Sequence, residues 1–110
     1  MNIDYIELPS TNMDAMKSFY GAAFGWTFVD WGPDYVSFSN AGLEGGFRGV
    51  DASPPRGGTM VILYAEDLED AERAVTGAGG KILERHEFPG GRRFQFADPS
   101  GNELAVWTKS

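Results

Sequence analysis

Apolar positions along the chain alternate between two spacings, and each change of spacing marks an element. Residues 3–8 (IDYIEL) are typical of a short strand, which Pro9-Ser10 ends. From Met13 to Phe24 the apolar residues recur at helical spacing. Thr11 or Asn12 can cap this helix, because a short side-chain oxygen accepts a backbone N–H, and Gly25 is typical of a helix stop. The start of the chain therefore predicts a strand followed by one helix.

The same order of elements recurs later in the chain. Residues 59–65 (TMVILYA) predict a strand, Asp67 a helix cap, residues 68–78 a second helix and Gly79-Gly80 its stop. A single offset of 55 residues places Ile6 on Val61 and Met13 on Leu68. Because one offset without gaps aligns both the strand and the helix, we interpret the two segments as an internal repeat.

Three strand-like runs follow each predicted helix, at residues 26–30, 35–39 and about 46–50, and at residues 81–85, 92–97 and 103–108. This order predicts an α+β fold: two βαβββ modules forming a curled mixed β-sheet, with one helix per module on the outer face. Module 1 spans about residues 1–52 and module 2 about residues 58–110, with a linker at about 51–58 (DASPPRGG). Each module is too small to bury enough surface alone, so residues 1–110 are predicted to form a single domain.

The composition of the chain limits the classes of partner that it is expected to bind. The chain carries nine Lys plus Arg against sixteen Asp plus Glu, a formal charge of −7, and it has no cysteine. A binder of nucleic acid or of an anionic membrane needs clustered cations, so neither is an expected partner. No signal-like segment opens the chain, and no apolar run approaches the roughly 18 residues that span a bilayer. We expect a cytoplasmic protein.

Four short motifs stand at the ends of the predicted elements. They are Ser18-Phe19-Tyr20, Phe24-Gly25-Trp26, Gly79-Gly80-Lys81 and Asp98-Pro99-Ser100-Gly101-Asn102. In this order the chain resembles, over its whole length, the vicinal-oxygen-chelate superfamily of glyoxalases, bleomycin-resistance proteins and extradiol dioxygenases, and especially its compact bacterial glyoxalase-like members. The residues also have a purely structural interpretation: Gly25, Gly80 and Gly101 permit positive φ, and Asp98 accepts backbone N–H bonds within its turn.

Side chains alternate along a strand, so each predicted strand has an aliphatic face for the helix and an opposite face. The resemblance implies that the strands curl around a cavity on the opposite face, where aromatic and polar groups suit a small organic ligand. An ordinary solvated face or a dimer interface is the alternative. The predicted ligand-binding residues on this face are Tyr5, Glu7, Met60, Ile62, Tyr64, Arg93, Gln95, Glu103 and Trp107, and Ala105 lies beside them.

The resemblance also implies where metal ligands belong, on the first, fourth, fifth and eighth strands. Three of these positions fall on Tyr5, Met60 and Ala105, which are poor ligands or have no donor atom. The fourth lies near residues 43–47 (LEGGF), where the register is open and Glu44 is the sole donor. The single histidine, His86, is predicted to follow the sixth strand, away from these positions. We therefore expect no metal and no cofactor.

Three functions remain open at the level of the sequence. The first is a metal-free cup, lined by Tyr5, Met60, Tyr64 and Trp107, that binds a small, partly aromatic or amphipathic molecule, with Glu7 favouring a cation. The second is a metal-dependent glyoxalase-like lyase or dioxygenase, in which Glu7 is the candidate base or pairs with Glu103 as a ligand. The alternative for Glu7 is a solvated or salt-bridged carboxylate. The third is a non-catalytic interaction module.

A homodimer is also predicted. The first half of the chain holds ten of the fifteen aromatic residues, more than one helix is expected to cover, and a two-fold symmetric contact can bury the excess. Pro54-Pro55 stiffens the linker and permits the modules to be exchanged between chains. The aromatic residues that motivate this prediction are Trp26, Phe28, Trp31, Tyr35, Phe38 and Phe47.

Overall fold

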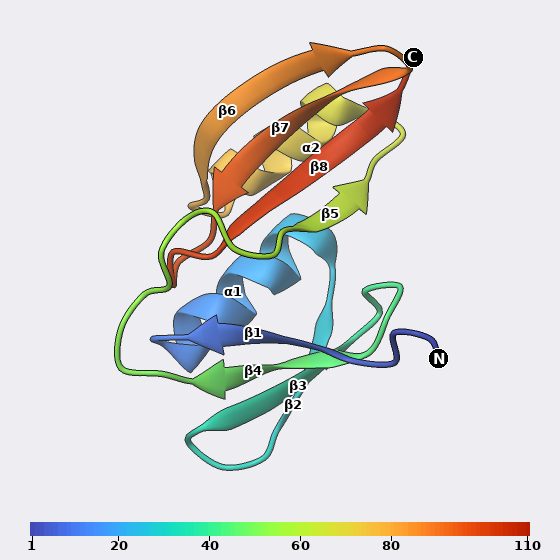
Figure 1. Ribbon diagram of the computed structural model, residues 1–110. Helices are drawn as coiled ribbons and strands as arrows, with labels where there is room; N and C mark the ends of the chain where they lie inside the picture. Colours follow the sequence, from blue (N-terminus) through green and yellow to red (C-terminus); the bar gives the residue numbers. More distant parts are fainter.

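The computed structural model describes all of residues 1–110 (Figure 1). The first module consists of β1 (Ile6–Ser10), α1 (Met13–Phe24), β2 (Thr27–Asp30), β3 (Tyr35–Ser39) and β4 (Gly45–Gly49). The second consists of β5 (Val61–Tyr64), α2 (Leu68–Gly77), β6 (Lys81–Phe88), β7 (Gly91–Ala97) and β8 (Glu103–Lys109). The predicted order of strand, helix and three strands is confirmed in both modules.

The eight strands form two mixed sheets of four strands each, in the orders β1-β4-β3-β2 and β5-β8-β7-β6. The first strand of each module pairs in parallel with the last, and the remaining pairs are antiparallel. The α+β class and the two βαβββ modules are confirmed. Strands β1 and β5 form the facing edges of the two sheets and are not hydrogen-bonded to each other (Figure 1).

Both helices begin where the sequence predicts. Oδ1 of Asn12 accepts the N–H of Ala15 at 3.0 Å, and Oδ1 of Asp67 accepts the N–H of Asp70 at 2.9 Å. Gly25 ends α1 in the left-handed conformation, with φ of 74°. At the end of α2 the positive φ belongs to Gly79 and not, as predicted, to Gly80. Gly80 is needed for a different reason, because a Cβ there would press on Val75 and on the ring of Phe19.

Two strand ends differ from the prediction. Pro9-Ser10 does not end the first strand, since β1 runs to Ser10 and Pro9 pairs with Arg48. Because β1 is an edge strand, the missing N–H of proline can face the unpaired side. Strand β6 runs on to Phe88, so His86 lies inside it, opposite Arg93, and not after it. The tight turn between β6 and β7 allows the two strands to pair along their whole length.

A single core lies between the sheets and the helices and draws on both modules. Phe19 and Phe24 of α1 contact Phe96 of β7, each with ring centroids 5.9 Å apart. Tyr20 stacks on Trp26 with centroids 4.5 Å apart. Because α1 packs against the second module as well as its own, the two modules share one apolar core. No helix is long and apolar enough to cross a membrane.

This core corrects the argument that the first module carries an excess of surface aromatic residues. Trp26, Phe38 and Phe47 are buried, and Phe28 packs against the core. The aromatic side chains of α1 stack on them, so one helix covers more aromatic surface than expected. Of the six residues that motivated the dimer, Trp31 alone is mostly exposed, at 67%.

The carboxylate of Asp98, in the turn between β7 and β8, joins the two modules. Its Oδ2 accepts the hydroxyl of Tyr20 and Nδ2 of Asn102, both at 2.8 Å. Its Oδ1 accepts the N–H groups of Ser100 and Asn102 at 2.9 and 3.0 Å. Burial raises the pKa of Asp98, and these hydrogen bonds oppose the rise. Tyr20 belongs to α1, so the bond from its hydroxyl crosses between modules.

Two further bonds strengthen the same junction. Nδ2 of Asn102 donates to the carbonyl of Pro9 at 2.8 Å, and the N–H of Thr11 donates to Oγ of Ser100 at 2.9 Å. We call Tyr20, Asp98, Ser100 and Asn102 the junction cluster. The prediction that Asp98 accepts backbone N–H bonds within its turn is thus confirmed, and the turn also ties β1 and α1 to the second module.

Removing the Tyr20 hydroxyl tests the junction cluster. Tyr20→Phe leaves the ring in place but deprives a buried carboxylate of one donor, so we expect the free energy of unfolding in urea to fall by about 1–3 kcal/mol. Tyr64→Phe is the matched control, because Tyr64 is exposed and its hydroxyl has no hydrogen-bond partner. Equal stability of the two variants would contradict the role of the cluster.

Candidate functional site

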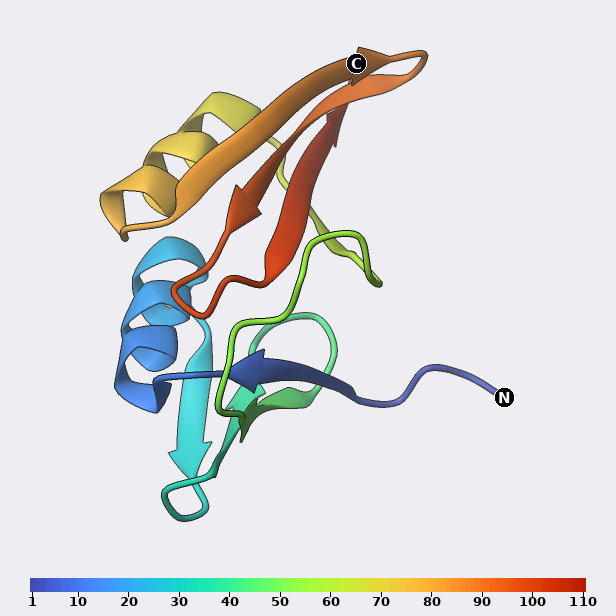
Figure 2. The same cartoon turned by 60° about the vertical axis from the view of Figure 1, so that its left-hand side comes forward.

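Each sheet has one face packed against the helices and one face that no helix covers, which we call its open face. In Figure 2 the two helices lie together on the left-hand side of the molecule. The open face of the first sheet carries Tyr5, Glu7, Val29, Tyr35, Ser37 and Arg48. The open face of the second sheet carries Ile62, Tyr64, Glu84, His86, Phe88, Arg93, Gln95, Glu103, Ala105 and Trp107.

A chain of polar contacts lies on the open face of the first sheet. The hydroxyls of Tyr5 and Tyr35 are 2.6 Å apart, and the Tyr35 hydroxyl donates to Oε2 of Glu7 at 2.9 Å. Nε of Arg48 lies 3.8 Å from Oε1 of Glu7. Desolvation, together with the hydrogen bonds to Tyr5 and Glu7, raises the pKa of Tyr35, so its phenol stays protonated and can donate. Glu7 therefore has the geometry of a salt-bridged carboxylate.

The phenol of Tyr35 also lies against Gly46 of β4. The sequence resemblance implies a metal ligand on this strand. Gly46 is opposite Glu7 in the β1–β4 register, and a Cβ at Gly46 would collide with the phenol of Tyr35. The register that the sequence left open is thus settled: Gly46 faces this side, and Glu44 precedes β4 and is exposed.

The donor set does not fit a metal ion. The Tyr5 hydroxyl is engaged with Tyr35, Met60 offers a soft thioether, and Gly46 and Ala105 have no donor atom. A catalytic site for an ion such as Zn²⁺ needs about three nitrogen, oxygen or thiolate ligands from the protein. No group of three or more His, Asp or Glu side chains lies close enough to hold one.

Aromatic side chains form a strip at one end of the second open face. Trp107 of β8 contacts Tyr64 of β5 edge to face, with centroids 5.1 Å apart, and Phe88 of β6 lies 6.4 Å from Trp107. Tyr64 and Phe88 are 42% and 40% exposed. Arg93 is opposite Trp107 in the β7–β8 register. We call Tyr64, Phe88 and Trp107 the aromatic strip.

Charged side chains gather at the other end of the same face. Oε2 of Glu103 accepts Nη2 of Arg56 and Nε2 of Gln95, both at 2.7 Å. Arg56 Nη2 also bonds Glu84, and Nε2 of His86 lies 2.7 Å from Oε1 of Glu84. The bonds from Arg56 and Gln95 lower the pKa of Glu103, and those from His86 and Arg56 lower the pKa of Glu84. Both carboxylates are therefore charged at neutral pH.

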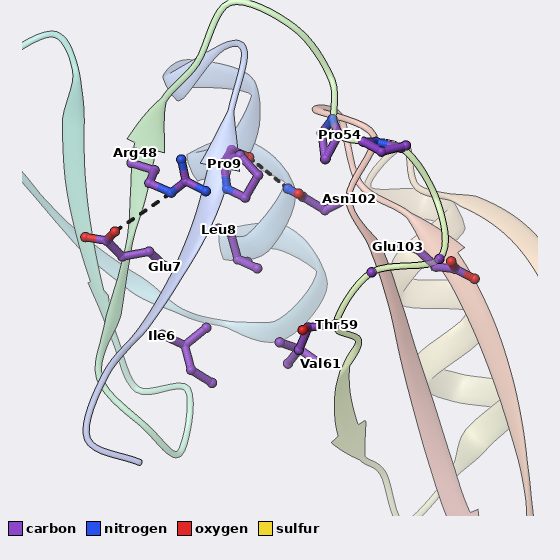
Figure 3. Close-up of a pocket in the computed structure, with 13 residues that line it drawn as sticks. Ile6, Glu7, Leu8, Pro9, Arg48, Pro54, Thr59, Val61, Asn102 and Glu103 are labelled. Carbon is purple, nitrogen blue, oxygen red and sulfur yellow. Dashed lines mark hydrogen bonds and ion pairs between the residues drawn. The ribbon is translucent and has the colours of Figure 1, made fainter.

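Two cavities lie along the gap between β1 and β5. The first, of about 300 Å³, has Glu7 and Arg48 on one side, and Glu103 and the linker on the other (Figure 3). The second, of about 340 Å³, is almost wholly apolar and includes Ile62 and Tyr64. Each volume is at the lower end of the range for small-molecule pockets, and both cavities are partly open to solvent.

The predicted ligand-binding residues thus divide between two half-sites. Tyr5 and Glu7 lie on the first sheet. Met60 lies half-buried just before β5, and the rest are on the second open face, as Ile62, Tyr64, Arg93, Gln95, Glu103 and Trp107. Within one chain Glu7 and Glu103 line the same cavity, while Tyr5 and Trp107 share none of the cavities described.

The sequence reasoning missed Tyr35, Arg48, Glu84 and Arg56. Tyr35 alternates with Val36 and Phe38, and this alternation was a usable signal for the open face. Glu84 gave none, because a bulge between Ile82 and Glu84 shifts the alternation of β6. Arg56 stands in the linker, where no periodicity applies.

Comparisons with solved structures agree with this architecture. A glyoxalase-related enzyme from Fulvimarina pelagi is 23% identical and superposes with a TM-score of 0.80, covering 98% of this chain and 88% of that one. TnmS3, an antibiotic binding protein from Streptomyces sp. CB03234, is 20% identical, with a TM-score of 0.72 and coverage of 100% and 97%. These likenesses establish the fold.

A third structure is more similar in shape and less similar in sequence. The fosfomycin resistance protein FosX from Listeria monocytogenes is 14% identical, with a TM-score of 0.85 and coverage of 100% and 94%. No curated protein matches the sequence significantly. The sequence pattern of one family, however, matches residues 2–106. The chain therefore belongs to the Glyoxalase/Bleomycin resistance protein/Dioxygenase superfamily.

Proposed function

We propose that this protein binds a small, partly aromatic cation on its open sheet faces without a metal. The observation that carries the proposal is the composition of the second open face, which has the aromatic strip at one end and the charged carboxylates of Glu84 and Glu103 at the other. An aromatic wall attracts both apolar rings and cations. TnmS3 is an antibiotic binding protein on the same fold, which favours binding as the role of these faces.

The charge of the chain supports a cationic ligand. The formal charge is −7, so the long-range field attracts cations toward the surface. Glu7, on the first open face, has Arg48 only at 3.8 Å and a side chain 44% exposed, which leaves it accessible to a ligand. A neutral or anionic ligand would gain nothing from either feature.

Binding without a metal is the part of the proposal that separates it from a lyase or dioxygenase. At the positions where relatives hold ligands, this chain has a phenol, a thioether and two residues without donors. The phenol of Tyr5 is already bonded to Tyr35. Glu7 remains the one candidate base, and its contacts with Tyr35 and Arg48 favour a role in orienting a ligand.

We further propose that the protein is a homodimer. The original argument from surface aromatic residues does not hold, but a different one replaces it. One chain presents two separate half-sites, and exposed apolar side chains remain on both open faces. A second copy that brings its first sheet against this second sheet encloses a cup and covers those side chains, among them Val29, Ile62, Tyr64 and Phe88.

Ligand binding is expected to quench Trp107. In a fluorescence titration with cationic aromatic compounds, we expect saturable quenching in the wild type and in Trp31→Phe, and loss of the signal in Trp107→Phe. Trp31 is exposed and its Nε1 bonds Ser37 on the first open face, so Trp31→Phe shows whether a ligand on that face contributes to the signal. No response across the panel, or an undiminished response in Trp107→Phe, contradicts the proposal.

The same titration tests metal independence. After treatment with EDTA the quenching should be unchanged, and Zn²⁺, Ni²⁺, Fe²⁺ and Mn²⁺ should leave the melting temperature unchanged, because a native-state ligand would raise it by mass action. A stabilisation by one of these ions that disappears in Glu7→Gln would establish the metal-dependent alternative.

The dimer is tested by sedimentation equilibrium at micromolar concentration. We expect a species of twice the 12.0 kDa chain mass. Tyr64→Asp, which places a charge among the exposed apolar side chains, should weaken association, whereas Ser18→Asp on the exposed side of α1 should not. A single species at the mass of one chain would remove the dimer and any cup formed from two chains.

A further inference from the structure

The linker places a cation of the protein itself on the second open face. Nη2 of Arg56 lies between Oε2 of Glu84 and Oε2 of Glu103, so one guanidinium group bridges β6 and β8. No backbone hydrogen bond outside the helices and strands involves residues 51–58, and a Cβ at Gly57 or Gly58 would meet no neighbour. The two ion pairs are therefore the polar contacts that hold Arg56 on this face.

The face offers more acceptors than Arg56 uses. Gln95, between the two carboxylates on β7, is only 5% exposed and donates through Nε2 to Glu103. Its Oε1 is buried and has no hydrogen-bond partner. A buried amide oxygen without a donor is rare in folded proteins. It is therefore an unused acceptor that lies beneath the two carboxylates, and a ligand can reach it only where the side chains above it move.

The charges fix the kind of ligand that this face takes. Glu84 and Glu103 lie on a face that also carries Lys81, Arg93 and Lys109. Arg56 is the cation that bonds both carboxylates, so its displacement leaves Glu103 with Gln95 and Glu84 with His86 as hydrogen-bond partners. Two neighbouring carboxylates favour a planar cation with several N–H donors, because such a cation can serve both at once. A quaternary ammonium has no N–H to donate.

The aromatic strip is placed to contact the aromatic half of the ligand. Gln95 is opposite Ala105, and Arg93 is opposite Trp107, so Trp107 lies two residues along β8 from Ala105 on the same face. Two residues of a strand span roughly 7 Å, which is about the distance from a carboxylate oxygen, through a hydrogen-bonded amidinium group, to the centre of its ring. A ligand with its cationic group at Glu103 therefore extends its ring along β8 toward the aromatic strip, above the buried Ala105.

We infer that Arg56 occupies, from within the chain, a subsite for an aromatic amidinium or guanidinium ligand, which binds by displacing Arg56 from Glu84 and Glu103. The inference rests on the proposed function and adds to it the ligand class and a built-in competitor. A tethered competitor lowers the apparent affinity by the fraction of time it leaves the subsite free. Removing Arg56 should thus increase the affinity of the protein for a cationic ligand.

Isothermal titration with benzamidinium tests this inference. We expect Arg56→Ala to bind benzamidinium about threefold to tenfold more tightly than the wild type, and Glu103→Gln to bind about tenfold more weakly. Benzyltrimethylammonium, which has no N–H donor, should bind more weakly than benzamidinium to Arg56→Ala. Arg73→Ala is the matched control: it removes the same charge from α2, where Arg73 pairs with Asp70, and should leave the affinity unchanged.

The outcomes separate this inference from the proposed function. If aromatic cations quench Trp107 but Arg56→Ala binds benzamidinium no more tightly than Arg73→Ala, Arg56 is not a competitor and the inference fails alone. If benzamidinium binds Arg56→Ala and not the wild type, the inference holds. If Arg56→Ala, Arg73→Ala and the wild type all fail to bind every compound of the panel, the inference and the proposed function both fail. Urea unfolding of Glu103→Gln confirms that weaker binding is not caused by a loss of fold.

Discussion

The structure depends on one buried carboxylate. Asp98 accepts four hydrogen bonds, and the one from Tyr20 crosses from α1 into the second module. A carboxylate in a largely apolar interior is tolerated only when its oxygens are satisfied, so the geometry of its partners is tightly constrained. Because α1 and β1 are fixed to the β7–β8 turn, the facing edges of the two sheets and the gap between β1 and β5 have a defined position. The cavities along that gap follow from this constraint.

The alternation of side chains along each strand places the core residues on one face of the sheet and the candidate binding residues on the other. On the inner faces, the helices and both sheets share one apolar core. On the open faces, most side chains lie outside that core, although Gln95 and Ala105 are buried. The sequence resemblance implies metal ligands at the positions of Tyr5, Met60 and Ala105, and none of these residues belongs to the helix-facing core. The phenol of Tyr35 lies over Gly46 and occupies the space, so the first open face is filled by a network of hydrogen bonds.

Much of the fold could be predicted from the sequence, because local signals and tertiary packing agree. Asn12 and Asp67 cap the helices as expected. The predicted end of the first strand at Pro9 was wrong. An edge strand tolerates proline, and that β1 is an edge strand is visible only once the sheet order is known. For a similar reason, Trp26, Phe38 and Phe47 were expected on the surface, since the stacking of aromatic residues from α1 onto the sheet cannot be read from spacing.

The site was predictable only in part. Period-two alternation placed Gln95, Glu103 and Trp107 on one face, as the structure shows. It could not show that Arg56 of the linker reaches that face, because a linker has no periodicity, nor that the bulge before Glu84 brings a second carboxylate there. The relation between the half-sites is a property of the junction cluster and the linker, and both act across sequence separations that no local pattern encodes.

The most direct test of the account is to locate a bound cation by NMR. Chemical-shift changes should be followed in ¹⁵N-labelled protein during titration with benzamidinium. The account predicts saturable changes at the side-chain amide of Gln95, the guanidinium of Arg56 and the indole N–H of Trp107, with the indole of the buried Trp26 unaffected. Changes confined to the first module or to the helices, or none at saturating concentration, would contradict the claim that the open face of the second sheet is a binding site for an aromatic cation.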